Sequence, residues 1–455
     1  MIELSQRIGA YAASLAYESL PADVVHQTKR TILDTVGCAF GGYRSMPSDV
    51  AHDLAATISS TKPGTIWCSG LRTSVDLAAF ANDVMVRYLD HNDGYISKGS
   101  GHPSDTIAAL IPIAEMQGAS GRELIVATVI AYEVFGRMCD VWANKMSGID
   151  HVTMGIAATT AGAARLYGLD ATQTAEALNI SLAANIALNQ TRFGNVSNWK
   201  AAGYANANRN AIFSVEMAAR GMTGPSPIFE GKYGFFKIVS REPFELEAFG
   251  GPDQQFCIMR SSVKRFPLGQ YAQTVAQAAL DAHVAIGGRY KDIDKVTVRT
   301  LKTGLLVMAD EPDKWRPQNR ETADHSMPFT AGVALMHGSV KHKHFDRFED
   351  PETLDLVSRI ACIESDEANA REAEMNLCEL DVVMQSGETH STRAEHHRGH
   401  WRNPMSDAEL EEKFRDLSEH VLPAEQASKL LEAIWRVDAA ASVDDLVALT
   451  ILPRA

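Results

Sequence analysis

The chain has 455 residues, with 43 Lys and Arg against 57 Asp and Glu, so its formal net charge is −14. This balance disfavours nucleic acid and anionic membranes as partners. No apolar stretch approaches the ~20 residues of a membrane span, and the N-terminus lacks the pattern of a secretory signal. The six cysteines have no metal-binding spacing. We expect a soluble, cytoplasmic protein with two or more domains and reduced thiols.

The first part of the chain predicts one helix after another. Residues 21–42 carry apolar side chains at helical spacing and end in a Gly pair that suits a helix terminus. Ser120 and Glu123 have the spacing of a capping box at the start of an apolar helix. Residues 151–167, rich in Gly and Ala, and residues 170–184 predict two more helices. Because small side chains let helix backbones approach, we expect a tightly packed helical core.

The pattern changes after Phe266-Pro267. We expect a helix over residues 271–285 and a strand over residues 295–301, where apolar and polar side chains alternate. Residues 379–392 have the pattern of a β-hairpin. These elements indicate a smaller α+β domain. From Ser406 the chain is helical again, and we expect this tail to return to the first domain.

The densest polar cluster is DHNDGYISKGSGHPS, residues 90–104, between two apolar helical runs. Loops held by rigid helices are where functional sites tend to lie. Asp90, Asp93 and His102 offer a base, an acid and an anion contact, but a solvated loop that caps the next helix explains them equally well. A metal bound by Asp90, His91, Asp93 and His102 is an alternative that the spacing does not favour.

Three further residues are candidate anion contacts. His151 stands at the start of a helix, where free backbone N–H groups also attract anions. Lys200 lies between an aromatic side chain and small residues, and lysine is rarely buried without a partner. Lys264 lies at the expected domain boundary, and clefts between domains often bind small ligands. The alternative for each is an ordinary surface side chain.

Other polar segments do not predict a familiar site. Asp324-His325-Ser326 lacks the glycine pattern of a serine nucleophile, so we expect no catalytic triad. The histidines of residues 396–400 are expected in an exposed loop. Residues 221–225 lack the ending of a phosphate-binding loop, and no dinucleotide fingerprint follows a strand. We therefore expect no nucleotide cofactor and no metal.

Eight segments, in order along nearly the whole chain, resemble the MmgE/PrpD family. That family includes 2-methylcitrate dehydratase, cis-aconitate decarboxylase and iminodisuccinate epimerase. The segments are LDTVGCAFGG, the 90–104 loop with its GHPSD ending, SGRELIVATVIAYEVFGR, HVTMGIAATTAGAARLYGLD, NWKAAGYANANRNAIFSVEMAARGMTGP, VKRFPLGQY, TADHSMPF and NPMSDAELEEKF.

The resemblance implies a mainly α fold. A large all-helical domain is formed by both termini, residues 1–266 and 404–455, and a smaller α+β lid domain by residues 267–403. The resemblance also implies a homodimer and no cofactor. Its active-site positions fall on Asp90, His102, His151, Lys200 and Lys264. We expect substrate contacts from Asp93, Tyr95, Arg192, His325, Ser326 and Phe329.

Two positions depart from the decarboxylase branch of the family. Phe329 stands where decarboxylase-like members carry a tyrosine, and Gly94 where they have a threonine. We therefore predict a hydro-lyase that dehydrates a hydroxy-tricarboxylate such as 2-methylcitrate, in propionate metabolism. The alternatives are an epimerase of the iminodisuccinate type, a cis-aconitate decarboxylase, and an inactive anion-binding protein.

The predicted chemistry removes a proton beside a carboxylate and creates a doubly charged enolate. Cations already in place must stabilise that charge, most strongly in a site that excludes water. Lys200, Lys264, His102 and His151 are the expected cationic groups. His102 or Asp90 is the expected base, and a second histidine the acid. An acidic protein can bind such an anion only if these groups meet in one pocket.

Overall fold

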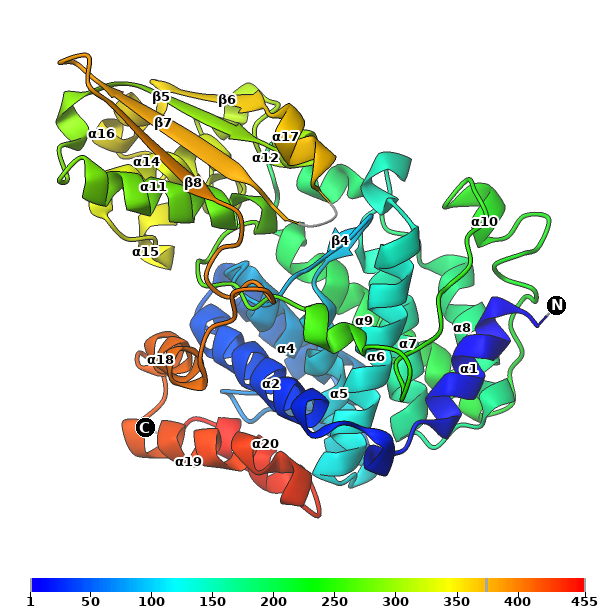
Figure 1. The fold of residues 1–455 in the computed structure, drawn as a ribbon. Coiled ribbons are helices and arrows are strands. Elements are labelled where there is room, and N and C mark those ends of the chain that lie inside the picture. Colours follow the sequence, from blue (N-terminus) through cyan, green and yellow to red (C-terminus); the bar gives the residue numbers. More distant parts are fainter. Residues whose placement is uncertain (1, 373–374, 454–455) are drawn as a thin grey trace.

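The computed structural model describes residues 2–372 and 375–453. It confirms the mainly α fold, with helices α1–α20 and only small sheets. Buried apolar side chains form two clusters, one from residues 4–263 and 405–447 and the other from residues 266–394. Figure 1 shows the corresponding helical body and, beside it, a smaller part that contains the largest sheet. None of the described helices combines the length and apolar character needed to cross a membrane.

The helical body is built around α6, α7 and α9, and α7 contacts both of the others. A Cβ on Gly162 of α7 would lie only 2.8 Å from the carbonyl oxygen of Ala127 on α6, so this glycine allows the close approach that the small residues predict. The helices of this body before the second cluster are α1 (Leu4–Ser14), α2 (Ala22–Gly42), α3 (Met46–Ala56), α4 (Val75–Tyr88), α5 (Ile107–Gln117), α6 (Gly121–Val141), α7 (Val152–Leu166), α8 (Ala171–Ala184), α9 (Trp199–Ala219) and α10 (Phe235–Ile238).

The predicted capping box is confirmed at the start of α6. The backbone N–H of Glu123 donates to Ser120 Oγ (3.3 Å), and the N–H of Ser120 donates to Glu123 Oε2 (2.7 Å). Asp170 and Gln173 make the same reciprocal bonds at the start of α8. Each box satisfies backbone donors that the first helical turn leaves without partners.

The smaller part contains a four-stranded sheet in the order β6-β5-β7-β8. β5 runs parallel to β6 and antiparallel to β7, and β7 and β8 form the predicted hairpin. Helices α11 and α14 cover one face of this sheet (Figure 1). The elements are α11 (Gln273–Ala285), β5 (Ile293–Thr300), α12 (Lys302–Met308), α13 (Arg320–Ala323), α14 (Met327–His337), α15 (His342–Phe345), α16 (Pro351–Val357), β6 (Ile360–Glu364), α17 (Asp366–Ala370), β7 (Cys378–Met384) and β8 (Thr389–Ala394).

The histidine-rich segment after β8 is not the exposed loop that its sequence predicts. His397 is fully buried and His400 nearly so. Their rings pack edge to face, with 5.6 Å between centroids, and His400 stacks on His396 at 4.5 Å. These histidines are therefore part of the packing between the two clusters of apolar side chains.

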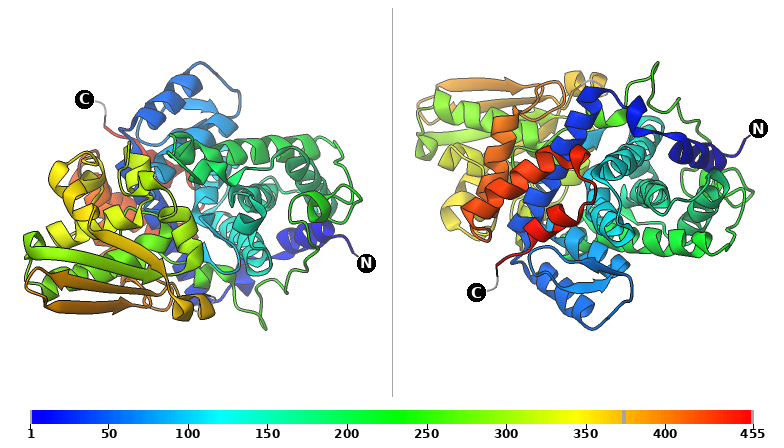
Figure 2. Two further views of the ribbon diagram at one scale, coloured as in Figure 1. Left: turned by 90° about the horizontal axis from the view of Figure 1, so that it is seen from above. Right: turned by 90° about the horizontal axis from the view of Figure 1, so that it is seen from below.

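The C-terminal helices return to the helical body, as expected. α18 (Asp407–Ser418) and α19 (Ala424–Trp435) pack on α2, and α20 (Asp444–Thr450) follows them. The view from below in Figure 2 shows this arrangement. Lys413 of α18 is buried and reaches inward. Its Nζ donates to the carbonyl oxygens of His91 (2.8 Å) and Lys264 (2.7 Å) and forms an ion pair with Asp34 of α2 (2.6 Å).

We predict that Lys413→Met strongly destabilises the protein. The substitution leaves the fully buried Asp34 carboxylate without its counter-ion, and breaking a buried pair from one side costs about 3–5 kcal/mol. The denaturant midpoint, followed by circular dichroism, should fall clearly below that of the unmodified protein.

Lys429→Met is the matched control. Lys429 lies on the neighbouring helix α19 and forms an ion pair with Glu425 at 2.7 Å, but both side chains are exposed. An exposed pair is screened by water, so this midpoint should not change measurably. Equal midpoints for the two variants would show that the buried Lys413 contacts contribute no more to stability than an exposed ion pair.

Candidate active site

The polar 90–104 segment is a loop between α4 and α5, but it is not solvated. It contains two short paired strands, β3 (Tyr95–Ile96) and β4 (Ser100–Gly101). Asp90, Asp93 and His102 are all buried. Of the two interpretations of the sequence, the solvated loop is therefore wrong. Burying so many polar groups is costly unless partners satisfy them. The partners of Asp90 are charged, whereas Asp93 and His102 bond to neutral groups.

Asp90 is the centre of the buried charges. Its Oδ1 accepts a hydrogen bond from Arg87 (2.7 Å) and binds Lys264 Nζ, while its Oδ2 lies 3.3 Å from Lys200 Nζ. Burial alone would raise the pKa of the Asp90 carboxyl, but these three cations hold it well below its usual value. Asp90 is therefore a permanent negative charge, which makes it a poor proton acceptor.

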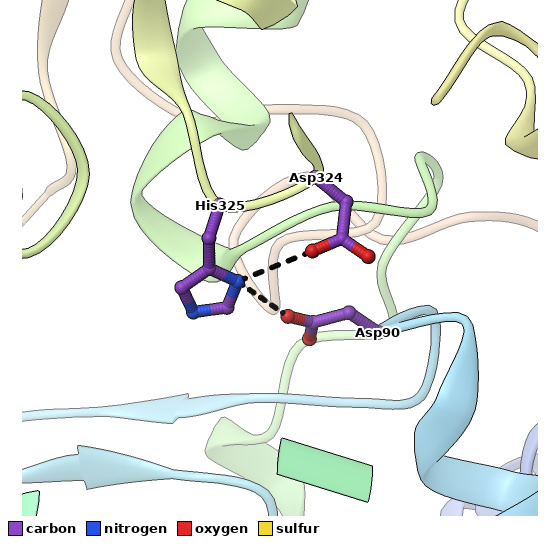
Figure 3. A group of neighbouring side chains, drawn as sticks. All are labelled: Asp90, Asp324 and His325. Carbon is purple, nitrogen blue, oxygen red and sulfur yellow. Dashed lines mark hydrogen bonds and ion pairs between the residues drawn. The ribbon is translucent and has the colours of Figure 1, made fainter. Parts of the chain in front are cut away.

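Asp324 and His325 bring the second part of the chain to the same point. His325 Nδ1 lies 3.1 Å from Asp90 Oδ2 and 3.4 Å from Asp324 Oδ1, as Figure 3 shows. Lys200 Nζ binds Asp324 Oδ1 as well as approaching Asp90. A lysine from α9 thus joins a carboxylate next to α4 to one next to α14. The site lies where the two parts of the chain meet.

Lys200 and Lys264 are buried, so neither is the surface side chain of the alternative interpretation. Burial lowers the pKa of the Lys264 ammonium to about 8, against the opposing effect of Asp90. Lys264 Nζ also donates to the backbone carbonyl of Asp90 (2.8 Å). Both lysines act first as counter-ions of Asp90, and they lie behind the cavity described below.

Three oxygen and nitrogen atoms of Asp90, Asp324 and His325 lie within 4.8 Å of one another, a spacing that a metal ion could span. Lys200 and Lys264 already bind these two carboxylates, so a cation would have to displace ammonium groups. The set offered by the sequence does not converge: within residues 2–372 and 375–453, Asp90, His91, Asp93 and His102 do not form such a group.

A cavity of about 40 Å³ lies directly beside this charged cluster. No Asp or Glu of the described chain lines it. The walls instead carry cationic, aromatic and amide side chains, so the cavity suits a small anion. Its lining residues are Arg87, Ser100, Gly101, His102, Lys145, His151, Arg192, Gln270, Tyr271, Val307, Met308 and His325.

His102 and His151 both line this cavity, and their rings contact each other edge to face, with 5.1 Å between centroids. His102 Nδ1 lies 2.6 Å from the carbonyl oxygen of Asp93, and His151 Nδ1 lies 2.8 Å from Asp150 Oδ1. These oxygens can only accept, so each Nδ1 carries the proton and each Nε2 keeps a lone pair. Burial lowers the pKa of His151 to about 4 and that of His102 well below its usual value, so both rings are neutral near pH 7.

Five buried polar atoms of cavity-lining residues have no hydrogen-bond partner among the described residues. They are Arg87 Nε, His151 Nε2, Arg192 Nη2 and both polar atoms of the Gln270 amide. Arg192 is otherwise well held, because its Nε donates to Asp150 Oδ2 at 2.9 Å. Leaving a buried charged donor unpaired costs about 1–3 kcal/mol or more, and a bound anion would remove this cost. Arg192 Nη2 is therefore a buried donor that is available to an anion in the cavity.

Four predicted substrate contacts do not line the cavity. Asp93 accepts hydrogen bonds from Tyr132 (2.8 Å) and the Ser104 backbone (3.1 Å), and Tyr95 donates to Asp140 (3.1 Å). Ser326 caps α14 through the N–H of Phe329, and the Phe329 ring packs on Phe345 in the second core. These side chains support the fold around the site, and the structure does not bring them to the cavity.

Sequence reasoning missed Arg87, Lys145 and Gln270, which all line the cavity. Arg87 had a usable signal, because it is a charged residue in the last turn of an otherwise apolar helix, three positions before Asp90. Lys145 and Gln270 had none. Lys145 lies in a short 3-10 helix, Asn144–Ser147, and its Nζ is 4.4 Å from the centre of the Tyr271 ring, a contact between residues far apart in the chain.

A larger cavity of about 640 Å³ lies between α18 and the loop after α14. Its walls carry four acidic side chains, Glu409, Glu412, Asp416 and Glu419, beside several basic ones. This mixture gives no preference for an anion. The smaller cavity beside Asp90 combines buried charge, unpaired polar atoms and neutral histidines, and is the candidate active site.

Two family models cover most of the chain. The MmgE/PrpD N-terminal domain matches residues 6–247, and the MmgE/PrpD C-terminal domain matches residues 266–438. The chain belongs to the MmgE/PrpD family. Both models include cavity residues, because His102 and His151 fall in the first and His325 in the second.

Characterised relatives differ in their named activities. The chain is 26% identical over 450 residues to cis-aconitate decarboxylase of Homo sapiens, covering 94% of this chain and 90% of that protein. It is 27% identical over 451 residues to 2-methylcitrate dehydratase of Cupriavidus necator, covering 91% and 90%. It is also 27% identical over 365 residues to a probable 2-methylcitrate dehydratase of Saccharomyces cerevisiae, covering 73% and 68%.

We predict that His151→Gln makes stability less dependent on pH between 4.5 and 6.5. In this range the unfolded chain binds a proton at residue 151, whereas the folded protein, whose His151 pKa is about 4, does not. Stability therefore falls as the pH falls, by up to about 1.4 kcal/mol per pH unit for this one group. Denaturant titrations across the range should give a shallower slope for the variant. Identical slopes would contradict a neutral, buried His151.

Proposed function

We propose that this protein is a hydro-lyase that dehydrates a small hydroxy-tricarboxylate such as 2-methylcitrate, without a cofactor. One observation carries the proposal: two neutral histidines face one small cavity whose other charged groups are cations. Removal of a proton beside a carboxylate needs a base of this kind, together with fixed positive charge to stabilise the enolate. The dehydratases among its relatives support the choice of reaction.

In the proposed reaction His102 removes the proton. Arg87 and Lys264 add to the effect of burial in keeping its ring neutral, and its Nδ1 is held by the Asp93 carbonyl, so Nε2 is the accepting atom. Asp90, the other base considered from the sequence, remains ionised between three cations and is too weak a base. Arg87, Arg192 and Lys145 on the wall take up the charge of the enolate, and Lys200 and Lys264 strengthen the positive field from behind.

His151 is the proposed acid. Its partner is a carboxylate, Asp150, which stabilises the imidazolium form, whereas the partner of His102 is a neutral carbonyl. A bound polycarboxylate adds negative charge beside His151 and so raises its pKa. The protonated ring can then donate from Nε2 to the departing hydroxyl, so that water leaves and the double bond forms. The two histidines therefore have different roles in this proposal, because the Nδ1 partner of His151 is a carboxylate and that of His102 is a neutral carbonyl.

The part around the second core is proposed to act as a lid, with residues 267–403 as the lid domain. Gln270, Tyr271, Val307, Met308 and His325 close the cavity from this side. A volume of about 40 Å³ holds only a few water molecules, so a tricarboxylate can enter only if the lid moves. Closure over the substrate would exclude water and strengthen each charge interaction.

Epimerisation of an imino-dicarboxylate is the second candidate. The cavity is lined by two neutral histidines, so a carbon that one of them deprotonates could receive a proton from the other. The two reactions are separable by experiment. Dehydration of 2-methylcitrate produces a conjugated alkene and a rise in ultraviolet absorbance. Epimerisation gives no such rise but introduces deuterium from the solvent into the substrate. Neither signal from any carboxylate would favour an inactive anion-binding protein.

We predict that His102→Ala and His151→Ala each lower kcat by about 10²–10⁴-fold, because each removes one proton-transfer group. Turnover of 2-methylcitrate, followed by absorbance, measures the effect. His420→Ala is the control, since His420 is exposed just after α18 and does not line the active-site cavity, so kcat should not change. Full activity in either active-site variant would remove that histidine from the mechanism.

We propose that the protein forms a homodimer, as the family resemblance implies. An apolar stripe on α3 supports this: Met46, Val50 and Leu54, spaced four residues apart on one face, are all about half exposed. Figure 2 shows α3 at the edge of the molecule. Trp199 at the start of α9 is also half exposed, and its neighbour Asn198 contacts Met46. An exposed apolar surface of this kind is typical of an interface.

Light scattering should therefore give twice the chain mass of 49.5 kDa. Leu54→Glu should shift the protein to the monomer, because it places a charge in the apolar stripe. Asp53→Ala, on the neighbouring exposed position of the same helix, should remain dimeric. A monomer for the unmodified protein would contradict the proposal.

A further inference from the structure

Gln270 has a buried amide that the fold does not use. Its side chain lines the active-site cavity and is 8% exposed, yet neither Nε2 nor Oε1 has a hydrogen-bond partner among the described residues. Three residues later, the amide of Gln273 donates to the carbonyls of Phe266 (2.8 Å) and Leu268 (3.2 Å) and accepts from the Phe266 N–H (3.3 Å). The side-chain amide of Gln273 is thus hydrogen-bonded within the fold, whereas that of Gln270 is not.

The backbone holds Gln270 in place. Asn376 Nδ2 donates to the Gln270 carbonyl (3.3 Å), and the N–H of the preceding Gly269 donates to the Asp324 carbonyl (2.9 Å). The amide therefore lies in the cavity wall because its chain segment is tied to the charged cluster. An unsatisfied buried amide costs about 1–3 kcal/mol, a cost that a ligand with matching groups would remove.

Gly94 provides the space that the Gln270 side chain occupies. A Cβ at position 94 would lie 2.7 Å from Gln270 Cδ and 3.3 Å from its Cγ, well inside ordinary contact. Gly94 cannot move away, because its N–H and carbonyl are both bonded to Ser262 at 2.8 Å. Its φ is not positive, so the glycine is required for close approach and not for its conformation. Residue 94 and Gln270 are therefore coupled.

The chemistry of the amide selects the ligand group. An amide presents donors at Nε2 and an acceptor at Oε1, whereas a carboxylate only accepts and a protonated amine only donates. A protonated amine would also be repelled by Arg87, Arg192 and Lys145 in the same wall. A hydroxyl both donates and accepts, and it is neutral.

We propose that Gln270, seated against Gly94, binds a hydroxyl of the substrate beside its carboxylates. The substrate class is then the hydroxy-polycarboxylates, in preference to amino-dicarboxylates and to unsubstituted acids such as cis-aconitate. This inference rests on the proposed function, because it assumes that a polycarboxylate fills the cavity. It adds Gln270 as the residue that recognises the hydroxyl group of the substrate.

Two pairs of ligands that differ in one hydroxyl test the inference by calorimetry. Citrate should bind the unmodified protein at least about tenfold more tightly than propane-1,2,3-tricarboxylate, and L-malate more tightly than succinate. A site built to bond a hydroxyl rejects the analogue that lacks it, since its buried polar groups are then unpaired. Gln270→Ala should abolish the preference within each pair while changing the affinity for the hydroxyl-free acids by less than about threefold.

Gly94→Ala tests the coupling with the glutamine intact. The added Cβ should push the amide out of place and also abolish the preference for the hydroxyl. Gln277→Ala is the control, because Gln277 on α11 bonds only to Asp281 at the exposed surface and should keep the preference. The preference needs no turnover to be measured, so it is independent of which histidine is base or acid.

The outcomes separate this inference from the proposed function. Equal binding within both pairs, or an unchanged preference in Gln270→Ala, overturns the role of Gln270 while a polycarboxylate site survives. A failure of every di- and tricarboxylate to bind overturns both. Tighter binding of L-aspartate than of L-malate would also overturn the assigned substrate class.

Discussion

The candidate active site depends on one buried negative charge. Asp90 lies without solvent contact between Arg87, Lys200 and Lys264, and it makes the burial of these three cations possible. Isolated charges of either sign would be expelled from such a place or would lose their charge. The cluster as a whole keeps a surplus of positive groups on the side that faces the cavity. The local charge at the cavity is therefore opposite in sign to the net charge of the protein.

The same cluster connects the parts of the molecule. Lys200 comes from α9, Asp324 from the segment before α14, and Lys264 from the junction between the two cores. The site is consequently an interface, and neither core forms it alone. His325 and Gln270 line the cavity from the second part, so the cavity wall is complete only when both parts are in place.

Sequence reasoning succeeds where the signal is local. The capping box of Ser120 and Glu123, the hairpin and the small-residue helix follow from spacing within a few residues, and all are present. The family resemblance likewise nominated His102, His151, Arg192 and His325, which line one cavity. It could not tell that Lys200 and Lys264 lie behind the wall, or that the polar atoms of Asp93 and Tyr95 are used within the fold. Such distinctions depend on contacts between residues 39 to 174 positions apart, which no local pattern carries.

The position of Lys413 has a consequence for biosynthesis. The 90–104 loop is made early in translation, but the ammonium group that holds the carbonyls of His91 and Lys264 belongs to a helix near the C-terminus. A nascent chain lacks this contact until α18 has been synthesised. The buried contacts beside Asp90 can accordingly be completed only late in the synthesis of the polypeptide.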